Sequence, residues 1–253
     1  TNVDAYRELR NTIRWMLGTL AHDTGEDVPL AEMPELERLM LHRLAELDEL
    51  VRKGYDDFDF KRIARALNDF ANIELSAFYF DVRKDALYCD SPASIRRRAA
   101  RTVLDELFSC LTAWLAPVIC FTAEEAWRTR NPGDEESVHL RTFPEIPPSW
   151  RDEDIATKWE KIRQVRRVVT GALEIERAEK RIGSSLQAAP IIGVSGEFGD
   201  SLKDVDLAEI CITSAAFLNV GNPDPDGFAL DDVPGVSVVP DNADGEKCER
   251  CWQ

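Results

Sequence analysis

Apolar residues recur every three or four positions along the first two thirds of the chain, a spacing that places them on one face of a helix. The pattern predicts five helices, at about residues 3–21, 34–53, 60–78, 92–117 and 122–130. Local signals mark their ends: Asp57 or Asp59 suits the start of the third helix, Gly54 the end of the second, and Thr122 with Glu125 forms a capping box. Five such helices joined by short loops predict an antiparallel bundle over residues 1–130 and a mainly α fold.

The pattern changes after the bundle. Residues 131–151 contain four prolines and a short strand-like run at 137–140, which is typical of a strap or linker. A long helix is expected from about 152 to 181, ended by Gly183. Short β-prone runs then follow at 189–194, 210–213, 215–220 and 236–239. We therefore expect residues 152–246 to form a long helix plus a small α+β module, with residues 247–253 as the start of a truncated zinc knuckle.

The formal net charge of −16 is unevenly distributed along the chain. Residues 197–246 hold twelve acidic residues and one basic residue, so the remainder is only mildly acidic. Two basic runs lie within that remainder, one at 96–98 with Arg101 and the other at Lys161, Arg163, Arg166 and Arg167. Because a binding surface depends on local potential, the net charge does not exclude RNA.

No run approaches the roughly 20 apolar residues that a membrane span needs, and the first residues lack the apolar core of a signal peptide. We expect a cytoplasmic monomer with no membrane partner and no DNA partner. Thr1 stands where an initiator Met would, which predicts a piece of a longer chain.

The six cysteines fall into two groups. Four are scattered singly and favour buried, reduced thiols over disulfides: Cys89, Cys110, Cys120 and Cys211. Cys248 and Cys251 form a CxxC turn, which can place two thiolates on one metal ion. Tetrahedral zinc needs four ligands, so this is a zinc half site at most, and a redox-active or incidental pair remains an alternative.

No catalytic constellation is evident in this chain. Three scattered histidines (His22, His42, His139) support no nucleophile–base–acid arrangement, and the glycines form no phosphate-binding loop. Helix capping accounts for Asp56, Asp57 and Asp59 better than acid–base chemistry does. We therefore expect no catalytic residue here.

The first helix carries a set of side chains suited to RNA. Cations bind phosphate, and flat groups stack on the unpaired bases of single-stranded loops. The residues expected to do so are Arg7, Arg10, Asn11, Arg14 and Trp15. The alternative is a solvated face on which Arg10 and Asn11 make structural hydrogen bonds. Further candidates for tRNA contact, each equally compatible with a solvated surface, are Arg97, Arg101, Arg166, Lys180 and Arg181.

Several strings occur together in an order that resembles the class I aminoacyl-tRNA synthetases. They are residues 4–12 (DAYRELRNT), 55–60 (YDDFDF), 121–127 (FTAEEAW), 137–140 (SVHL) with Phe143 and Pro144, and 181–188 (RIGSSLQA). The string GEKCERCW at 245–252 is similar to the first half of the C-terminal zinc motif of the bacterial isoleucyl-tRNA synthetases. The valyl and leucyl enzymes, and a helical interaction scaffold without an RNA role, remain as alternatives.

The resemblance implies that the bundle binds the tRNA anticodon stem-loop, and it adds Lys53 to the tRNA-binding candidates. It also implies a parent enzyme that attaches isoleucine to its tRNA with ATP and Mg²⁺, and a zinc site completed downstream of Cys251. The signature motifs of the catalytic domain and the editing domain are absent from these 253 residues, so we expect the chain to be inactive as a ligase by itself.

Overall fold

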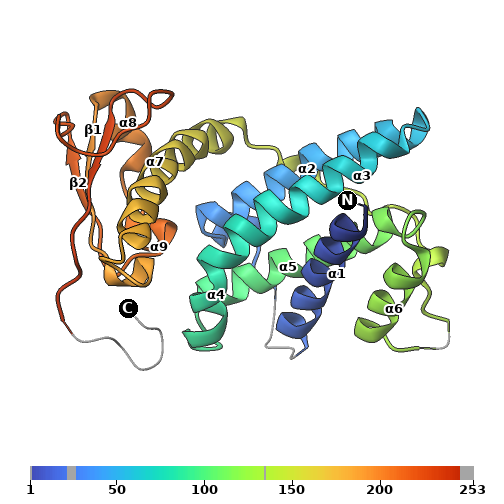
Figure 1. The fold of residues 1–253 in the computed structure, drawn as a ribbon. Helices are drawn as coiled ribbons and strands as arrows, with labels where there is room; N and C mark the ends of the chain where they lie inside the picture. Colours follow the sequence, from blue (N-terminus) through green and yellow to red (C-terminus); the bar gives the residue numbers. More distant parts are fainter. Residues whose placement is uncertain (1, 22–26, 134, 246–253) are drawn as a thin grey trace. The chain divides into compact units, whose positions relative to one another are not determined.

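The computed structural model describes residues 2–21, 27–133 and 135–245 (Figure 1). The chain divides into two compact units, Thr1–Asp152 and Glu153–Gln253. Among the described residues, no helix is both long enough and apolar enough to cross a bilayer.

The first unit is a helical bundle, which confirms the mainly α prediction. Its long helices are α1 (Asn2–Leu20), α2 (Glu35–Asp56), α3 (Phe60–Asp69), α4 (Phe80–Cys89), α5 (Ile95–Leu115) and α6 (Cys120–Arg130). A π-helical segment, Phe70–Tyr79, joins α3 to α4 without a break, and short 3₁₀ turns lie at Leu30–Glu32, Val138–Leu140 and Pro148–Trp150. The largest fully buried side chains of the core include Trp114, Tyr79, Phe78, Phe108 and Met16.

Cross-helix contacts fix the direction of α1 in the bundle. The Asn72 amide donates to the Glu8 carboxylate at 2.6 Å, and the Thr12 and Ser76 hydroxyls lie 3.2 Å apart. Both partners advance by four residues from one contact to the next, so α1 runs parallel to the α3–α4 path. A buried ion pair ties that path to α2, because the Arg83 guanidinium donates to both oxygens of Glu37 at 2.7 and 2.8 Å. Such hydrogen bonds offset the desolvation of the two buried charges.

The end of α2 differs from the sequence prediction, whereas the cap of α3 is one of the two that were predicted. Gly54 does not end α2, which continues to Asp56; a Cβ at Gly54 would lie 2.5 Å from Ile63 Cγ1, so the glycine serves close packing of α2 on α3. The helix ends instead through Phe58, whose φ of 57° is left-handed, and the Asp59 amide donates to the Gly54 carbonyl. Asp59 then caps α3, since its carboxylate accepts from the Arg62 amide at 3.1 Å.

The predicted capping box at Thr122 is wrong. Thr122 lies inside α6, where its hydroxyl is 2.9 Å from the hydroxyl of Tyr6, and α6 begins two residues earlier without a side-chain cap. The Thr122 hydroxyl, which a helix cap would use, instead contacts Tyr6 on α1.

The strand-like run at 137–140 is also not a strand. It forms the 3₁₀ turn Val138–Leu140, because the described residues of the first unit offer no strand to pair with it and the Glu124 carboxylate accepts from the Val138 amide at 2.9 Å and the Ser137 hydroxyl at 3.0 Å. The residues that follow contact two helices: the Arg141 guanidinium donates to the Ser109 carbonyl on α5, and Arg52 on α2 donates to the Pro144 carbonyl. Further along, the Asp152 amide donates to Nδ1 of the buried His42 at 2.9 Å.

The second unit packs a long helix, α7 (Glu153–Ala178), against a small sheet. The strand order is β2 (Phe217–Val220), β1 (Ile191–Val194), β3 (Val236–Val239), with β1 parallel to β2 and antiparallel to β3. The short helices α8 (Gly196–Leu202) and α9 (Leu207–Cys211) lie in the crossover that a parallel pair requires, and a 3₁₀ turn covers Ser185–Gln187.

Two predictions for this unit need correction. The run at 210–213 is not a strand, because the Asp206 carboxylate accepts from the Glu209 amide at 3.0 Å and starts α9 across it. The long helix ends before Gly183: Lys180 adopts φ 59°, and the Arg181 amide donates to the Glu176 carbonyl at 2.9 Å. The end of α7 is therefore set by the left-handed Lys180 and by a hydrogen bond to a carbonyl of its last turn, and no glycine is needed.

Candidate functional site

One face of α1 carries five of the eleven predicted RNA-binding side chains. The opposite face buries Leu9, Thr12, Ile13, Met16 and Leu20 against the bundle. Arg7, Arg10, Asn11 and Arg14 are consequently exposed, and Trp15 is half-buried at the edge of the same face. The helical period therefore brings together the set predicted from the sequence.

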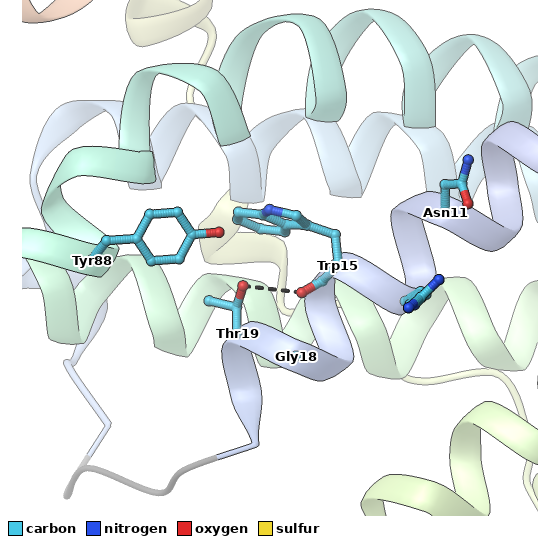
Figure 2. Close-up of a pocket in the computed structure, with 6 residues that line it drawn as sticks. Asn11, Trp15, Gly18, Thr19 and Tyr88 are labelled. Atoms are coloured by element: carbon cyan, nitrogen blue, oxygen red, sulfur yellow. Dashed lines mark hydrogen bonds between the residues drawn. The ribbon is translucent and has the colours of Figure 1, made fainter.

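A surface pocket of about 450 Å³ lies at the far end of this face. It is lined by Asn11, Arg14, Trp15, Gly18, Thr19 and Tyr88 (Figure 2). Tyr88 comes from the last turn of α4 and is 57% exposed, and its ring extends toward the Trp15 indole (Figure 2). The pocket thus joins the end of α1 to the end of α4.

One face of the Trp15 indole packs against a side chain of the core. Its ring stacks on the buried Phe80 ring with centroids 4.0 Å apart and an interplanar angle of 18°. The Thr19 hydroxyl donates to the Trp15 carbonyl at 3.0 Å, so that hydroxyl is already engaged within the helix (Figure 2). These contacts present a fixed aromatic surface to the pocket.

Gly18 keeps the pocket open. A Cβ at this position would meet no atom within 4 Å, so neither packing nor backbone conformation requires glycine there. Glycine within a helix costs about 0.5–1 kcal/mol relative to alanine. Because position 18 has no side chain, this part of the pocket wall has no bulk that a ligand would meet.

The polar groups of the face are available to a ligand. Arg10, Asn11 and Arg14 form no side-chain hydrogen bond or ion pair with any residue that the structure describes. Arg7 is 71% exposed and only approaches Asp4, at 4.0 Å. The nearby Glu8 carboxylate accepts from Asn72. Three cations and an amide therefore face solvent beside an aromatic surface.

The other candidates in the first unit are engaged within the chain. Lys53 pairs with Asp57 at 2.7 Å on an exposed surface. Arg97 donates to the Asp90 carbonyl at 2.7 Å, and Arg101 donates to the Thr19 carbonyl at the end of α1. Burial raises the pKa of the Asp90 carboxyl, but hydrogen bonds from Arg96 and Ser94 outweigh it and lower that pKa overall. Both arginines thus donate to backbone carbonyls near the pocket, since Thr19 lines it and Asp90 follows Tyr88 by two residues.

Two of the three candidates in the second unit, Arg166 and Arg181, also make contacts within the chain. Arg166 donates to the Ile210 carbonyl at 2.9 Å and so stabilises the end of α9. Arg181 donates to both oxygens of Glu176, and these hydrogen bonds lower the pKa of that carboxyl. Lys180 is exposed at the left-handed end of α7.

The predicted zinc half site lies outside the part of the chain that the structure describes, because Cys248 and Cys251 both fall beyond residue 245. Within residues 2–21, 27–133 and 135–245, no group of three or more His, Cys, Asp or Glu side chains is placed to hold a metal ion. Cys89, Cys110, Cys120 and Cys211 are free thiols.

Comparison with known families decides the class of protein. The family described as "Anticodon-binding domain of tRNA ligase" matches residues 37–192, more than half of the chain. The chain belongs to this family.

Curated relatives agree with the assignment. Isoleucine–tRNA ligases from Brucella abortus biovar 1 (strain 9-941), Agrobacterium fabrum and Bartonella henselae are 63%, 61% and 58% identical to this chain over its whole length. The chain spans 26% of the length of each of these relatives. The family match begins at residue 37, so α1 lies before it, whereas the matches to the relatives include α1.

The sequence pattern did not predict three residues that line the pocket, namely Gly18, Thr19 and Tyr88. The third helix was expected to end near residue 78. The sequence pattern therefore placed Tyr88 in no helix and predicted no contact between it and the first helix. The continuous helical path from Phe60 to Cys89 carries it to the end of α1. An exposed aromatic in the last turn of a helix was the available signal.

Proposed function

We propose that this chain is the tRNA-binding part of an isoleucine–tRNA ligase, and that the α1 face and its pocket contact the anticodon stem-loop. The observation that carries the proposal is the pocket itself, which is lined by a fixed Trp15 indole, by Tyr88 and by Gly18, at which an added Cβ would meet no atom. Unpaired bases are bound by stacking and by hydrogen bonds to their edges. Asn11 supplies an amide that both donates and accepts.

The cations extend this site along the helix. Arg7, Arg10 and Arg14 lie at successive turns of α1, a spacing suited to the phosphates of a stem that approaches the pocket. Lys53, Arg97, Arg101, Arg166, Lys180 and Arg181 remain proposed contacts, but each ion pair or carbonyl contact described above would compete with RNA for the same cation. The α1 set is therefore the centre of the proposal.

The activity of the longer protein is proposed from its relatives. Proteins named isoleucine–tRNA ligase match the whole chain, which supports a parent that attaches isoleucine to tRNA with ATP and Mg²⁺ bound elsewhere in the polypeptide. A cytoplasmic monomer without DNA or membrane partners fits this role. We also propose that Cys248 and Cys251 supply two of four zinc ligands. Metal analysis of a polypeptide extended beyond Gln253 should then return about one equivalent of zinc.

Binding to tRNA tests the proposal directly. Electrophoretic shifts at low salt should show tighter binding of the 253-residue chain to isoleucine tRNA than to the same tRNA with a swapped anticodon. The full-length ligase serves as the control for weak binding by the shorter chain. Equal affinity for the two tRNAs, in both proteins, would remove the anticodon claim.

Amino-acid activation tests the identity of the parent. The full-length polypeptide should exchange pyrophosphate into ATP in the presence of isoleucine. A preference for valine or leucine would favour the alternative synthetases, and no exchange with any amino acid would favour an interaction scaffold.

A further inference from the structure

Two aromatic rings of the α3–α4 path belong to the proposed RNA site. Phe80 packs against the Trp15 indole. Tyr88, about two turns further along, lines the pocket (Figure 2). Both residues follow the π-helical segment Phe70–Tyr79, and Phe80 is the next residue after it. The directions of the two rings therefore depend on the rotation with which the helix leaves this segment.

A π-helical segment changes the rotation of every residue that follows it. Its hydrogen bonds span five positions in place of the four of an α-helix, so each turn holds an additional residue. One residue of an α-helix corresponds to a rotation of about 100°. If the segment were wound with one residue more or fewer, Phe80 and Tyr88 would turn away from Trp15. A contact beyond the segment must therefore select one rotation.

A buried group of polar side chains at the end of the segment can make this selection. Arg83 Nε and Nη2 donate to the two carboxylate oxygens of Glu37 on α2 at 2.7 and 2.8 Å, and the Tyr79 hydroxyl donates to Glu37 at 3.1 Å. Glu37, Tyr79 and Arg83 are 0%, 0% and 3% exposed, and we call them the Glu37 network. Burial, followed by the Glu37 carboxylate, raises the pKa of Tyr79 well above its ordinary value, so the hydroxyl keeps the proton that it donates.

Neighbouring residues on the same helix cannot replace this network. Tyr79 and Arg83 are four residues apart and so lie on one face. A shift by one residue would present Phe80 and Lys84 instead, which offer neither a hydroxyl nor a planar guanidinium with paired donors. Glu37 would then be buried without its partners, which is strongly unfavourable. The residue types themselves therefore specify a single rotation of α4.

Stability alone does not account for a buried ion pair, because well-packed apolar residues in its place are often as stable or more stable. We propose that the Glu37 network positions the tRNA site: by fixing the rotation of α4, it places Phe80 against Trp15 and Tyr88 at the pocket. Its members are buried and act through these rings without touching RNA. This inference rests on the proposed function, in that the site it positions is the proposed tRNA site.

The indole N–H resonance of Trp15 tests the proposal without RNA. In a proton–nitrogen correlation spectrum of the 253-residue chain, the signal is assigned by its loss in Trp15→Phe. The double variant Glu37→Met/Arg83→Met removes the whole ion pair at constant net charge and should displace or split this signal. The indole signal of Trp127 on α6 should stay in place. An unchanged Trp15 signal in the double variant would overturn the proposal.

Affinity for tRNA gives the second readout. The double variant should bind isoleucine tRNA at least about fivefold more weakly than the unchanged chain, the loss expected when one base stacks poorly on an aromatic ring. Its midpoint of urea unfolding should change little, because methionines fill the space of the pair. Unchanged affinity despite a displaced Trp15 signal would also overturn the proposal.

A second ion pair in the same unit provides the matched control. Arg52 Nε donates to both oxygens of Asp48 at 2.9 and 2.8 Å within α2. Asp48→Leu/Arg52→Met likewise removes two opposite charges, and it should leave the Trp15 signal and the affinity for tRNA unchanged. If this control changed both as much as the first double variant does, general loosening of the bundle would explain the effect and the proposal would fail.

A milder variant keeps the proposal testable if the first double variant does not fold. Tyr79→Phe removes one hydroxyl at nearly constant shape and should displace the Trp15 signal by a smaller amount. No displacement in Tyr79→Phe, together with an unfolded double variant, would assign the network to stability alone and overturn the proposal. Equal binding of the unchanged chain to isoleucine tRNA and to an anticodon-swapped tRNA would count against the proposed function instead, and the Trp15 signal would still decide the positioning.

Discussion

The Trp15 indole lies against the Phe80 ring, with centroids 4.0 Å apart and planes 18° from parallel. Phe80 is buried in the bundle, whereas Trp15 is half-buried and lines the pocket. A side chain of the core therefore fixes the orientation of a side chain of the binding face. A ligand base that stacks on Trp15 meets a ring whose rotamer freedom has already been lost on folding.

Replacing Trp15 should weaken RNA binding more than it weakens the fold. Stacking of one base on an aromatic side chain contributes about 1–3 kcal/mol, so Trp15→Ala should reduce affinity for the anticodon stem-loop by about 5- to 150-fold. Trp15→Phe keeps a flat ring and should retain most of the affinity. Fluorescence anisotropy titration measures both. An alanine variant that binds as the parent chain does would remove Trp15 from the site.

Gly18 offers a pair of variants that separate stability from binding. Gly18→Ala adds a methyl group into open space and should stabilise the chain by about 0.5–1 kcal/mol in denaturant titration, with little change in RNA affinity. Gly18→Phe should fill the pocket and weaken binding by tenfold or more, an effect of about 1.4 kcal/mol or more. Equal RNA affinity of the two variants would show that the pocket does not admit a base.

Salt dependence should report the cations of α1. Each cation that contacts phosphate releases counterions, so Arg10→Gln and Arg14→Gln should each lower the slope of log affinity against log salt by about 1. Arg65→Gln is the control, since Arg65 is exposed on α3 and lies 3.6 Å from Asp69. A slope that changes as much in the control as in the α1 variants would assign the effect to net charge alone.

Gly54→Ala should destabilise the first unit. The added Cβ would lie 2.5 Å from Ile63 Cγ1, and overpacking of this kind costs about 1–3 kcal/mol. Ile63→Ala removes that Cγ1, so the double variant should be less destabilised than the sum of the two single variants. Urea denaturation of the four proteins completes the cycle. Strict additivity would mean that the two positions do not meet as described.

Alkaline pH should destabilise the chain through Cys110. Burial raises the pKa of this thiol from 9.0 to about 12, whereas in the unfolded chain it ionises near its ordinary value. The unfolded state therefore loses its proton first, so the stabilisation is complete below about pH 9 and is lost as pH rises toward 12. Cys110→Ala should flatten the fall of unfolding free energy over this range. Cys120→Ala, at an exposed thiol, is the control; similar slopes in both variants would contradict the assignment.

The helical part of the fold was predictable because its apolar spacing is regular and long. The stripe of α1 predicted both its buried face and the opposite face that carries Arg10, Asn11 and Arg14. β2 and β3 were also found from their β-prone residues. Helix ends were less predictable, since Phe58 and Lys180 adopt left-handed conformations that neither residue type favours.

The bundle, the family resemblance and the composition of the α1 face could be predicted from the sequence, because helical periodicity and local strings depend on near neighbours in the chain. Only the tertiary structure brought Tyr88 to Trp15, placed Phe80 behind the indole and engaged Arg101 with the end of α1. Each of these contacts joins residues more than 60 positions apart, and their geometry depends on how the helices pack. Packing direction is a property of the whole core, which no local pattern encodes.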